Sequence, residues 1–246
     1  KKEGKRDGKQ DDKRDAKRDS KIKNNKKNGG GNADVYVREK GSITPLEFYK
    51  KCVPFKLENM VALIHYPSEG RKKYTLYDIK YIENVYGGKS TNFISVSQDD
   101  MIHCCKKSID GGCAIWFAGD VNFDMNNKHG IMDPDSYNTR LLFGFESGRL
   151  KKGERLQYYD TEPNHAMVIN GYNLDSSKIN RWKVENSWGD DIGQAGYYTM
   201  TSKWFNENVF MVVVDKKFVN KKILGVLSQK PTVLQPWDPF GTSAKI

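Results

Sequence analysis

The chain has 246 residues, with 41 Lys or Arg against 31 Asp or Glu and a formal net charge of +10. This length allows one large or two modest domains. No apolar stretch approaches the roughly 20 residues that span a bilayer, and the first residues show no signal-peptide core. Four cysteines, two of them adjacent, form no disulfide framework, which favours a reducing, cytoplasmic setting.

The first 32 residues have their own composition. They hold thirteen Lys or Arg, six Asp or Glu, and only Ala16 and Ile22 as apolar side chains. Such a segment cannot bury enough surface to offset its ordering entropy, so residues 1–32 are predicted to be a disordered basic segment. Its surplus of positive charge permits a weak contact with nucleic acid, which the interspersed acids oppose.

Residues 33–96 are predicted to form a separate region ahead of the main domain. Thr44, Pro45 and Glu47 supply an N-cap, a first-turn proline and a capping-box carboxylate, so a short helix is expected to begin there. Apolar segments separated by turn residues predict extended structure at Met60 to Tyr66, Tyr74 to Tyr86 and Phe93 to Val96.

Residues 97–230 are predicted to form a β-rich domain. A capping pattern at Ser97 begins a helix expected to reach Ile109, and a buried strand is expected at Ala114 to Ala118. From Gln157 to Asp215 the pattern predicts mostly strands, interrupted by a short helix that Thr201 caps. The fold class is therefore α+β, with a β-rich C-terminal half.

His165 and Asn186 form the strongest candidate site. His165 begins an apolar run typical of a buried strand, and residues 181–185 alternate as a half-buried strand does. Period-2 geometry places Trp182, Val184 and Asn186 on one face, so the amide can meet the histidine of a neighbouring strand. In a thiol protease a histidine moves the proton and a third group holds its ring, a task that an asparagine carbonyl can perform.

These residues lie within a wider pattern. Asn186-Ser187-Trp188-Gly189, with His165 upstream and Gly196-Tyr197 downstream, resembles the papain-like cysteine peptidases. The sequence around Arg181–Asp190, together with Val212–Lys217 and Pro236–Gly241, is similar to the bleomycin hydrolase and aminopeptidase C branch of that superfamily. The resemblance runs from about Thr44 to Ala244.

The resemblance implies a fold and an activity. It implies a β-barrel-like right-hand domain that carries His165 and Asn186, preceded by part of the branch's insertion, with a helical left-hand domain outside this chain. Catalysis would be cysteine aminopeptidase chemistry on peptides, in which Trp188 covers the His–Asn contact. It further implies a homohexamer and no cofactor.

The resemblance also assigns residues 231–246 to a C-terminal arm. In the family this arm enters the active-site cleft and its terminal carboxylate faces the amino group of the substrate. The matching positions here are Gly241, Thr242, Ser243 and Ala244. The chain departs from the pattern with Lys245-Ile246, and the hypothesis is that the enzyme trims these two residues.

The nucleophile of the family has no counterpart in this sequence. Cys104 and Cys105 are predicted to occupy later turns of the Ser97 helix, away from the N-terminal dipole that lowers a thiol pKa. The chain begins with Lys, so it is expected to be the C-terminal part of a longer protein whose N-terminal half supplies the cysteine. The alternative is a non-catalytic scaffold that binds nucleic acid or protein. His65, His103 and His129 lack the spacing of metal ligands, and no metal site is expected.

Overall fold

The computed structural model describes residues 43–53, 56–83, 85–88, 90–145 and 150–241. The basic segment 1–32 and the arm residues Thr242, Ser243 and Ala244 lie outside the described residues. The chain divides into two compact units, Lys1–Phe55 and Lys56–Ile246. Within the described ranges, no helix has the length and apolar character needed to cross a membrane.

The described part of the first unit contains one helix, α3 (Pro45–Cys52). Thr44 is its N-cap: the Glu47 amide donates to Thr44 Oγ1, and the Thr44 amide donates to the Glu47 carboxylate at 2.9 Å. These hydrogen bonds from Thr44 lower the pKa of Glu47. The capping box predicted from the sequence is confirmed, because each residue satisfies an N–H that the first helical turn leaves free.

The second unit alternates strands with short helices. Its strands are β1 (Met60–Ile64), β2 (Leu76–Ile79), β3 (Phe93–Ser95), β4 (Ile115–Gly119), β5 (Met125–Asn126), β6 (Ile131–Met132), β7 (His165–Asp175), β8 (Lys178–Glu185), β9 (Tyr197–Thr201), β10 (Val209–Asp215) and β11 (Thr232–Leu234). Its α-helices are α4 (Gln98–Asp110), α5 (Thr139–Phe143), α6 (Lys152–Gln157), α7 (Ser202–Asn208) and α8 (Lys221–Leu224). The 3-10 turns are η1 (Leu57–Asn59), η2 (Pro134–Ser136), η3 (Lys216–Phe218) and η4 (Gly225–Ser228).

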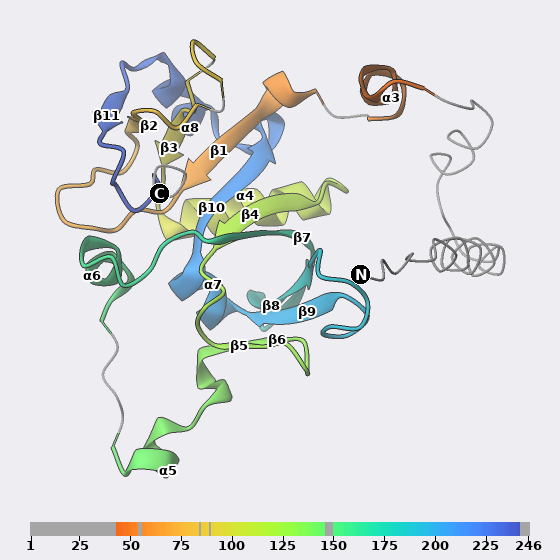
Figure 1. The fold of residues 1–246 in the computed structure, drawn as a ribbon, viewed down its shortest axis with the longest axis vertical. Helices are drawn as coiled ribbons and strands as arrows, with labels where there is room; N and C mark the ends of the chain where they lie inside the picture. The colour runs from red at the N-terminus through yellow and green to blue at the C-terminus, as the bar shows by residue number, and fades with distance from the viewer. Residues whose placement is uncertain (1–42, 54–55, 84, 89, 146–149, 242–246) are drawn as a thin grey trace, which may run out of the picture. The chain divides into compact units, whose positions relative to one another are not determined.

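One sheet joins the described strands in the order β11-β2-β3-β1-β10-β4-β7-β8-β9-β6-β5. Figure 1 shows it passing from β2, β3 and β1 through β10 and β4 to the β8 and β9 pair. Strands from residues 60–95 therefore share hydrogen bonds with strands that follow residue 97. The sheet crosses the boundary expected between residues 96 and 97, because β1 pairs antiparallel with β10 along its whole length.

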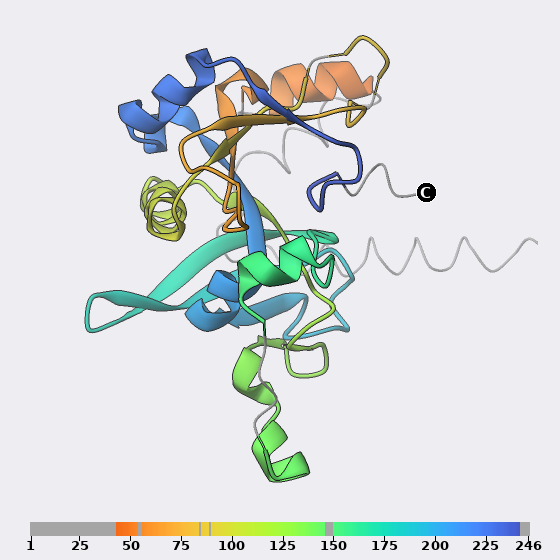
Figure 2. The same cartoon turned by 90° about the vertical axis from the view of Figure 1, so that its left-hand side faces the viewer.

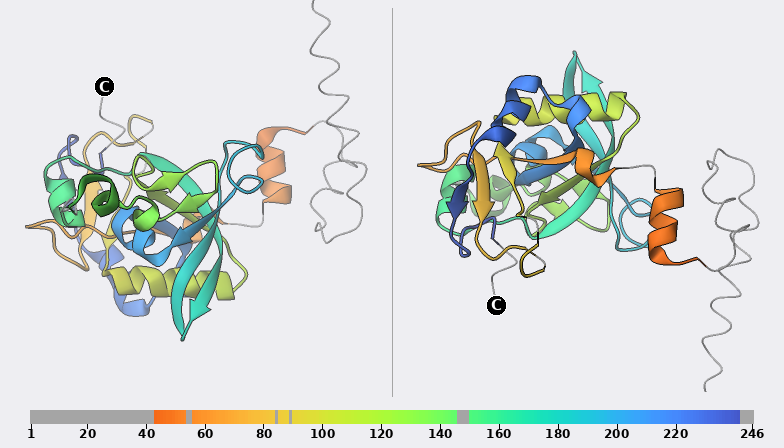
Figure 3. Two further views of the ribbon diagram at one scale, coloured as in Figure 1. Left: turned by 90° about the horizontal axis from the view of Figure 1, so that it is seen from below. Right: turned by 90° about the horizontal axis from the view of Figure 1, so that it is seen from above.

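The strands β7 and β8 form a long antiparallel hairpin. Figure 3 shows its tip extending past the neighbouring strands. Along β8 the side chains alternate, with Trp182 and Val184 buried and Lys183 and Glu185 exposed, as the period-2 pattern predicted. The short helix α5 projects away from the sheet beyond β5 and β6 (Figures 1 and 2).

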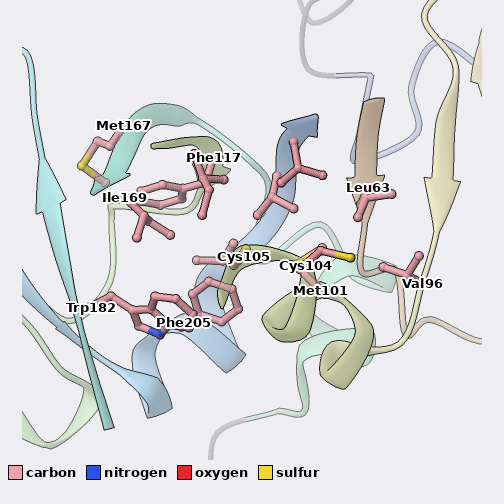
Figure 4. Packing of buried hydrophobic residues seen from close by; sticks show 14 of the residues in the cluster. Leu63, Val96, Met101, Cys104, Cys105, Phe117, Met167, Ile169, Trp182 and Phe205 are labelled. Carbon is pink, nitrogen blue, oxygen red and sulfur yellow. The ribbon is translucent and has the colours of Figure 1, made fainter. Parts of the chain in front are cut away.

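The helix α4 covers the centre of the sheet. Ser97 caps it by accepting from the Asp100 amide, as predicted. Its inward face buries Met101, Cys104 and Cys105 against the β4 and β7 side chains Phe117 and Ile169, as Figure 4 shows. Burial of this apolar face, at about 25 cal/mol per Å² of surface removed from water, accounts for most of the helix's stability in this position.

Two sequence-based expectations need correction. The segment Tyr74 to Tyr86 is predicted to be extended, in one piece or broken. Among its described residues only Leu76–Ile79 forms a strand, and Tyr81 turns the chain with φ 63°. Strands were also expected from Gln157 onward, yet Gln157 ends α6 and the next strand begins at His165. Both errors arise where apolar residues serve turns and helix ends instead of a continuous strand.

Candidate active site

The sheet brings His165 and Asn186 together at one end of neighbouring strands. His165 is the first residue of β7, and Asn186 directly follows β8. Antiparallel pairing of these strands leaves the two side chains side by side, with His165 Nε2 2.9 Å from Asn186 Oδ1. The predicted meeting of the two residues is confirmed.

The hydrogen bonds around Asn186 assign the proton on the imidazole. The main-chain N–H of Ser187 also donates to Asn186 Oδ1, at 2.8 Å, which identifies that atom as the carbonyl oxygen. Nε2 of His165 must therefore carry the proton that it donates. Nδ1 is left to accept a proton, and among the described residues no hydrogen bond to Nδ1 is found.

Trp188 packs on the face of the imidazole. The ring centroids of His165 and Trp188 are 4.7 Å apart, with planes inclined by 31°. Trp188 contacts the histidine while it stays 39% exposed. The turn that carries Trp188 is closed by a hydrogen bond from the Asn186 amide to the Gly196 carbonyl. A packed ring and a closed turn restrict the rotation of the imidazole.

A polar cluster around the buried side chain of Asp120, which contacts the residue before His165, was not predicted from the sequence. Asp120, only 1% exposed, follows β4 and accepts from Thr161 Oγ1 at 2.7 Å and Asn164 Nδ2 at 2.6 Å. It also accepts from the main-chain N–H of Asn122 at 3.0 Å. The partners lie two to 44 residues away along the chain, so no local sequence pattern predicts the cluster.

Two buried cations support the adjoining end of α7. Lys152 donates to the carbonyls of Asn206 and Val209, and Arg155 donates to the carbonyl of Glu207 at 2.8 Å. Carbonyls at a helix C-terminus lack partners within the helix, and a positive charge there interacts favourably with the negative end of the helix dipole. Burial lowers the pKa of Lys152 to about 7, and a neutral amine still has two N–H groups for its two carbonyls.

Cys104 and Cys105 are poor candidates for a nucleophile. All four cysteines are free. Cys104 and Cys105 are 2% and 0% exposed in the core under α4, as ordinary packed residues. Burial raises the pKa of Cys104 to about 11, and burial also raises the pKa of Cys105. Because the thiolate is the reactive form, neither thiol is activated, and neither forms a hydrogen bond with His165 in the described structure.

The described part of the C-terminal arm is firmly anchored. Asp238, 4% exposed, accepts from Arg71 Nη2 at 2.7 Å, from Tyr66 Oη at 2.9 Å and from the Phe240 amide at 3.0 Å. The Phe240 ring packs on Tyr66, with centroids 4.5 Å apart. Gly241 ends the described arm in a tight turn, where a Cβ atom would lie 2.3 Å from the Pro236 carbonyl oxygen.

Two cavities lie beside these elements. One of about 350 Å³ adjoins Asp238 and Arg71, and one of about 860 Å³ adjoins Lys152 and His65. Neither is lined by His165 or Asn186. Within the described residues, no group of three or more His, Cys, Asp or Glu side chains is placed to hold a metal ion.

A family model, the Peptidase C1-like family, matches residues 31–241. The chain belongs to the Peptidase C1-like family. Aminopeptidase C of Listeria monocytogenes is 35% identical over 213 residues, which cover 87% of this chain and 48% of that protein. Human bleomycin hydrolase is 38% identical over 210 residues, which cover 83% of this chain and 46% of that protein.

The chain spans about half the length of the curated relatives it matches, and the match is to their C-terminal half. A solved structure, PepW from Lactobacillus rhamnosis HN001, superposes with a TM-score of 0.78 at 34% identity, covering 81% of this chain and 45% of that one. The family member described here thus has a papain-like peptidase fold of mixed α and β content.

Proposed function

We propose that this chain supplies the acid–base part of a cysteine aminopeptidase, with His165 as the proton-transfer group and Asn186 as the residue that orients it. One observation carries the proposal. The imidazole donates from Nε2 to Asn186 Oδ1 at 2.9 Å and packs under Trp188, which leaves Nδ1 to receive a proton. A base with one fixed tautomer and one free nitrogen is what thiol activation requires.

The chemistry then follows in balanced steps. Nδ1 of His165 takes the proton of a cysteine thiol, and the thiolate attacks the carbonyl carbon of the first peptide bond. The imidazolium returns its proton to the leaving amine, and a thioester remains. The imidazole next deprotonates a water molecule, whose oxygen attacks the thioester, and the departing sulfur recovers the proton.

We infer that the thiol comes from polypeptide outside this sequence. Cys104 and Cys105 are buried without activation, and the chain covers less than half of its relatives' length. The β-rich unit would then be the right-hand, barrel-like domain, and the preceding half would supply a helical left-hand domain with the nucleophile. The active-site cleft would lie between the two halves.

The arm provides a basis for exopeptidase selectivity. Phe240 packs on Tyr66 and Phe210, which lie where β1 ends and β10 begins. Val209 of β10 pairs with Gly119 of β4, which pairs with His165. The arm is therefore anchored at the same end of the sheet as His165, three strand spacings away or roughly 15 Å. From Gly241 the residues Thr242, Ser243 and Ala244 would carry a carboxylate toward the substrate's α-ammonium group.

The proposal extends to location, assembly and the chain ends. We place the protein in the cytoplasm, because its four cysteines are free. The family resemblance implies a homohexamer. The composition of residues 1–32 predicts a weak nucleic-acid contact, and the departure of Lys245-Ile246 from the family pattern motivates the hypothesis that these two residues are trimmed. Intact-mass measurement tests the trimming, and salt-dependent retention on DNA with and without residues 1–32 tests the contact.

The test is hydrolysis of an aminoacyl fluorogenic amide by the complete protein. His165→Ala is expected to lower kcat by roughly 10³-fold or more, and Asn186→Ala by about 10- to 100-fold. His103→Ala, an exposed histidine on α4, and Cys105→Ser are matched controls expected to keep the wild-type rate. The amide with an acetylated amino group is expected to be a poor substrate.

Opposite results would overturn the proposal. Full turnover by His165→Ala would remove the role of the imidazole, absence of turnover in the complete wild-type protein would favour the non-catalytic scaffold, and loss of turnover in a Cys105→Ser variant shown to be folded would reassign the nucleophile. The isolated chain is expected to show no turnover, while the complete protein shows activity that iodoacetamide abolishes.

A further inference from the structure

Asp120 is a buried carboxylate that is held entirely by neutral donors. Its two oxygens accept from the Thr161 hydroxyl, the Asn164 amide and the Asn122 main chain, and the residue is 1% exposed. Within the described chain no Lys or Arg nitrogen pairs with it. Burying a carboxylate without a cation is costly, and the hydrogen bonds from these three donors offset part of that cost.

The cluster holds the peptide that leads into His165. Asn164 uses both ends of its side chain: Nδ2 donates to Asp120, and Oδ1 accepts from the Val121 amide at 3.0 Å. The Asn164 main-chain N–H also donates to the Gly119 carbonyl at 3.1 Å. The residue before His165 is thus tied at three points to residues 119–121, which removes its freedom to rotate.

Asp120 is itself anchored to the next layer of structure. Its main-chain N–H donates to the Asn208 carbonyl at 3.0 Å, at the end of α7. The adjoining Gly119 leaves no room for a side chain, since a Cβ atom would lie 2.7 Å from that carbonyl oxygen. Lys152 and Arg155 hold the neighbouring carbonyls of α7. Hydrogen bonds and the main chain of α7 therefore connect α6 to the peptide before His165, with Asp120 as the buried link.

We propose that Asp120 is a positioning residue for the reaction at His165. By fixing Asn164, it sets the direction in which the imidazole leaves β7 and keeps Nε2 within reach of Asn186. This inference rests on the proposed function above. Positioning of a reacting group to within a fraction of an ångström is worth orders of magnitude in rate, so a loosened histidine lowers kcat while substrate binding persists.

The replacements of Asp120 separate geometry from charge. Asp120→Ala removes the acceptors for Asn164, Thr161 and Asn122. Asp120→Asn keeps an oxygen for Asn164 and for the Asn122 amide, and its NH₂ group can donate to the Thr161 hydroxyl, which also accepts. A positioning role predicts that the asparagine variant recovers most of the activity that the alanine variant loses.

The experiment measures kcat and KM of the complete protein with an aminoacyl fluorogenic amide. Asp120→Ala is expected to lower kcat by about 10- to 100-fold with KM within about threefold, and Asp120→Asn to stay within about fivefold of wild type. The matched control is Asp133→Ala. Asp133 also accepts from a main-chain amide and a threonine hydroxyl, those of Asp135 and Thr201, but does not contact residues 164–165.

The outcomes distinguish this inference from the proposed function. If His165→Ala abolishes turnover while folded Asp120→Ala keeps the wild-type kcat, the positioning role is wrong and the proposed function stands. If Asp120→Ala fails to fold, Asn164→Ala takes its place, since it removes the same link with the carboxylate left intact, and an unchanged kcat there refutes the role equally. If His165→Ala retains turnover, the proposed function itself fails.

Discussion

Two buried aspartates in this domain have their carboxylates hydrogen-bonded by different kinds of side chain. Asp120 and Asp238 each accept from the main-chain amide two residues ahead and from two side chains. Asp238 receives Tyr66 and the cation Arg71, whereas Asp120 receives the neutral Thr161 and Asn164. One buried carboxylate therefore has a charged partner, and the other has only neutral donors among the described residues.

The difference has an electrostatic reason. The Arg71 side chain is 31% exposed, so the Asp238 pair sits at the surface end of the arm, where a cation retains part of its hydration. Asp120 adjoins the peptide before His165, whose proposed role includes a positively charged imidazolium. A cation placed there would disfavour that form, while neutral donors supply geometry without adding positive charge.

The largest expected effect comes from removing the cation at Asp238. Arg71→Ala leaves a buried carboxylate without its charge partner, which costs about 3–5 kcal/mol for a fully buried pair. Because Arg71 is partly exposed, about 2–3 kcal/mol is expected here. Hydrogen exchange in residues 236–241 of the complete protein measures it. Lys203→Ala, which breaks an exposed pair with Asp135, is expected to change exchange little.

A second prediction tests the backbone beneath Asp120. Gly119→Ala places a Cβ atom 2.7 Å from the Asn208 carbonyl oxygen, so two backbones must move apart. A loss of about 1–3 kcal/mol is expected, with faster exchange at the start of β10. Gly171→Ala in β7 is the control, since its Cβ atom would lie 3.4 Å from Lys183 Cβ. An equal free energy of unfolding for both variants would show that the backbone at Gly119 can move to accommodate a Cβ atom.

A third prediction removes one hydroxyl donor from each of the two aspartates. Tyr66→Phe and Thr161→Val each remove one donor from one aspartate, and each is expected to cost about 1–2 kcal/mol. Only the Thr161 variant is expected to alter kcat as well, because its aspartate leads to His165. The test is to measure thermal unfolding and kcat for both variants. An equal loss of kcat in both would contradict the expectation that only Thr161 affects catalysis.

The last prediction is a pH dependence that belongs to neither aspartate. Burial lowers the pKa of His65 to about 4, with further lowering by Lys152. The unfolded chain therefore binds a proton that the native chain does not as pH falls from 6.5 toward 4, and stability is lost across that window. One such group gives a slope of at most about 1.4 kcal/mol per pH unit. His65→Gln is expected to flatten the slope measured by denaturant unfolding, and an unchanged slope would assign the dependence elsewhere.

Local patterns predicted several parts of the fold correctly. The capping residues Thr44, Ser97 and Thr201 each begin a helix, because an N-cap is a contact between residues three positions apart. Alternation along β8 placed Asn186 on the side of His165 for a similar reason. The period of a strand alone decides which side chains share a face.

What sequence alone determined is the pairing of an imidazole with an amide, since spacing and strand periodicity encode it within about twenty residues. Only the tertiary structure decided which residues form hydrogen bonds with the two buried aspartates. Asp120 meets Asn164 from 44 residues away, and Asp238 meets Arg71 from 167 residues away. A buried charge selects its partners through the packing of whole elements, and contacts between residues so far apart in the chain leave no periodic trace in the order of amino acids.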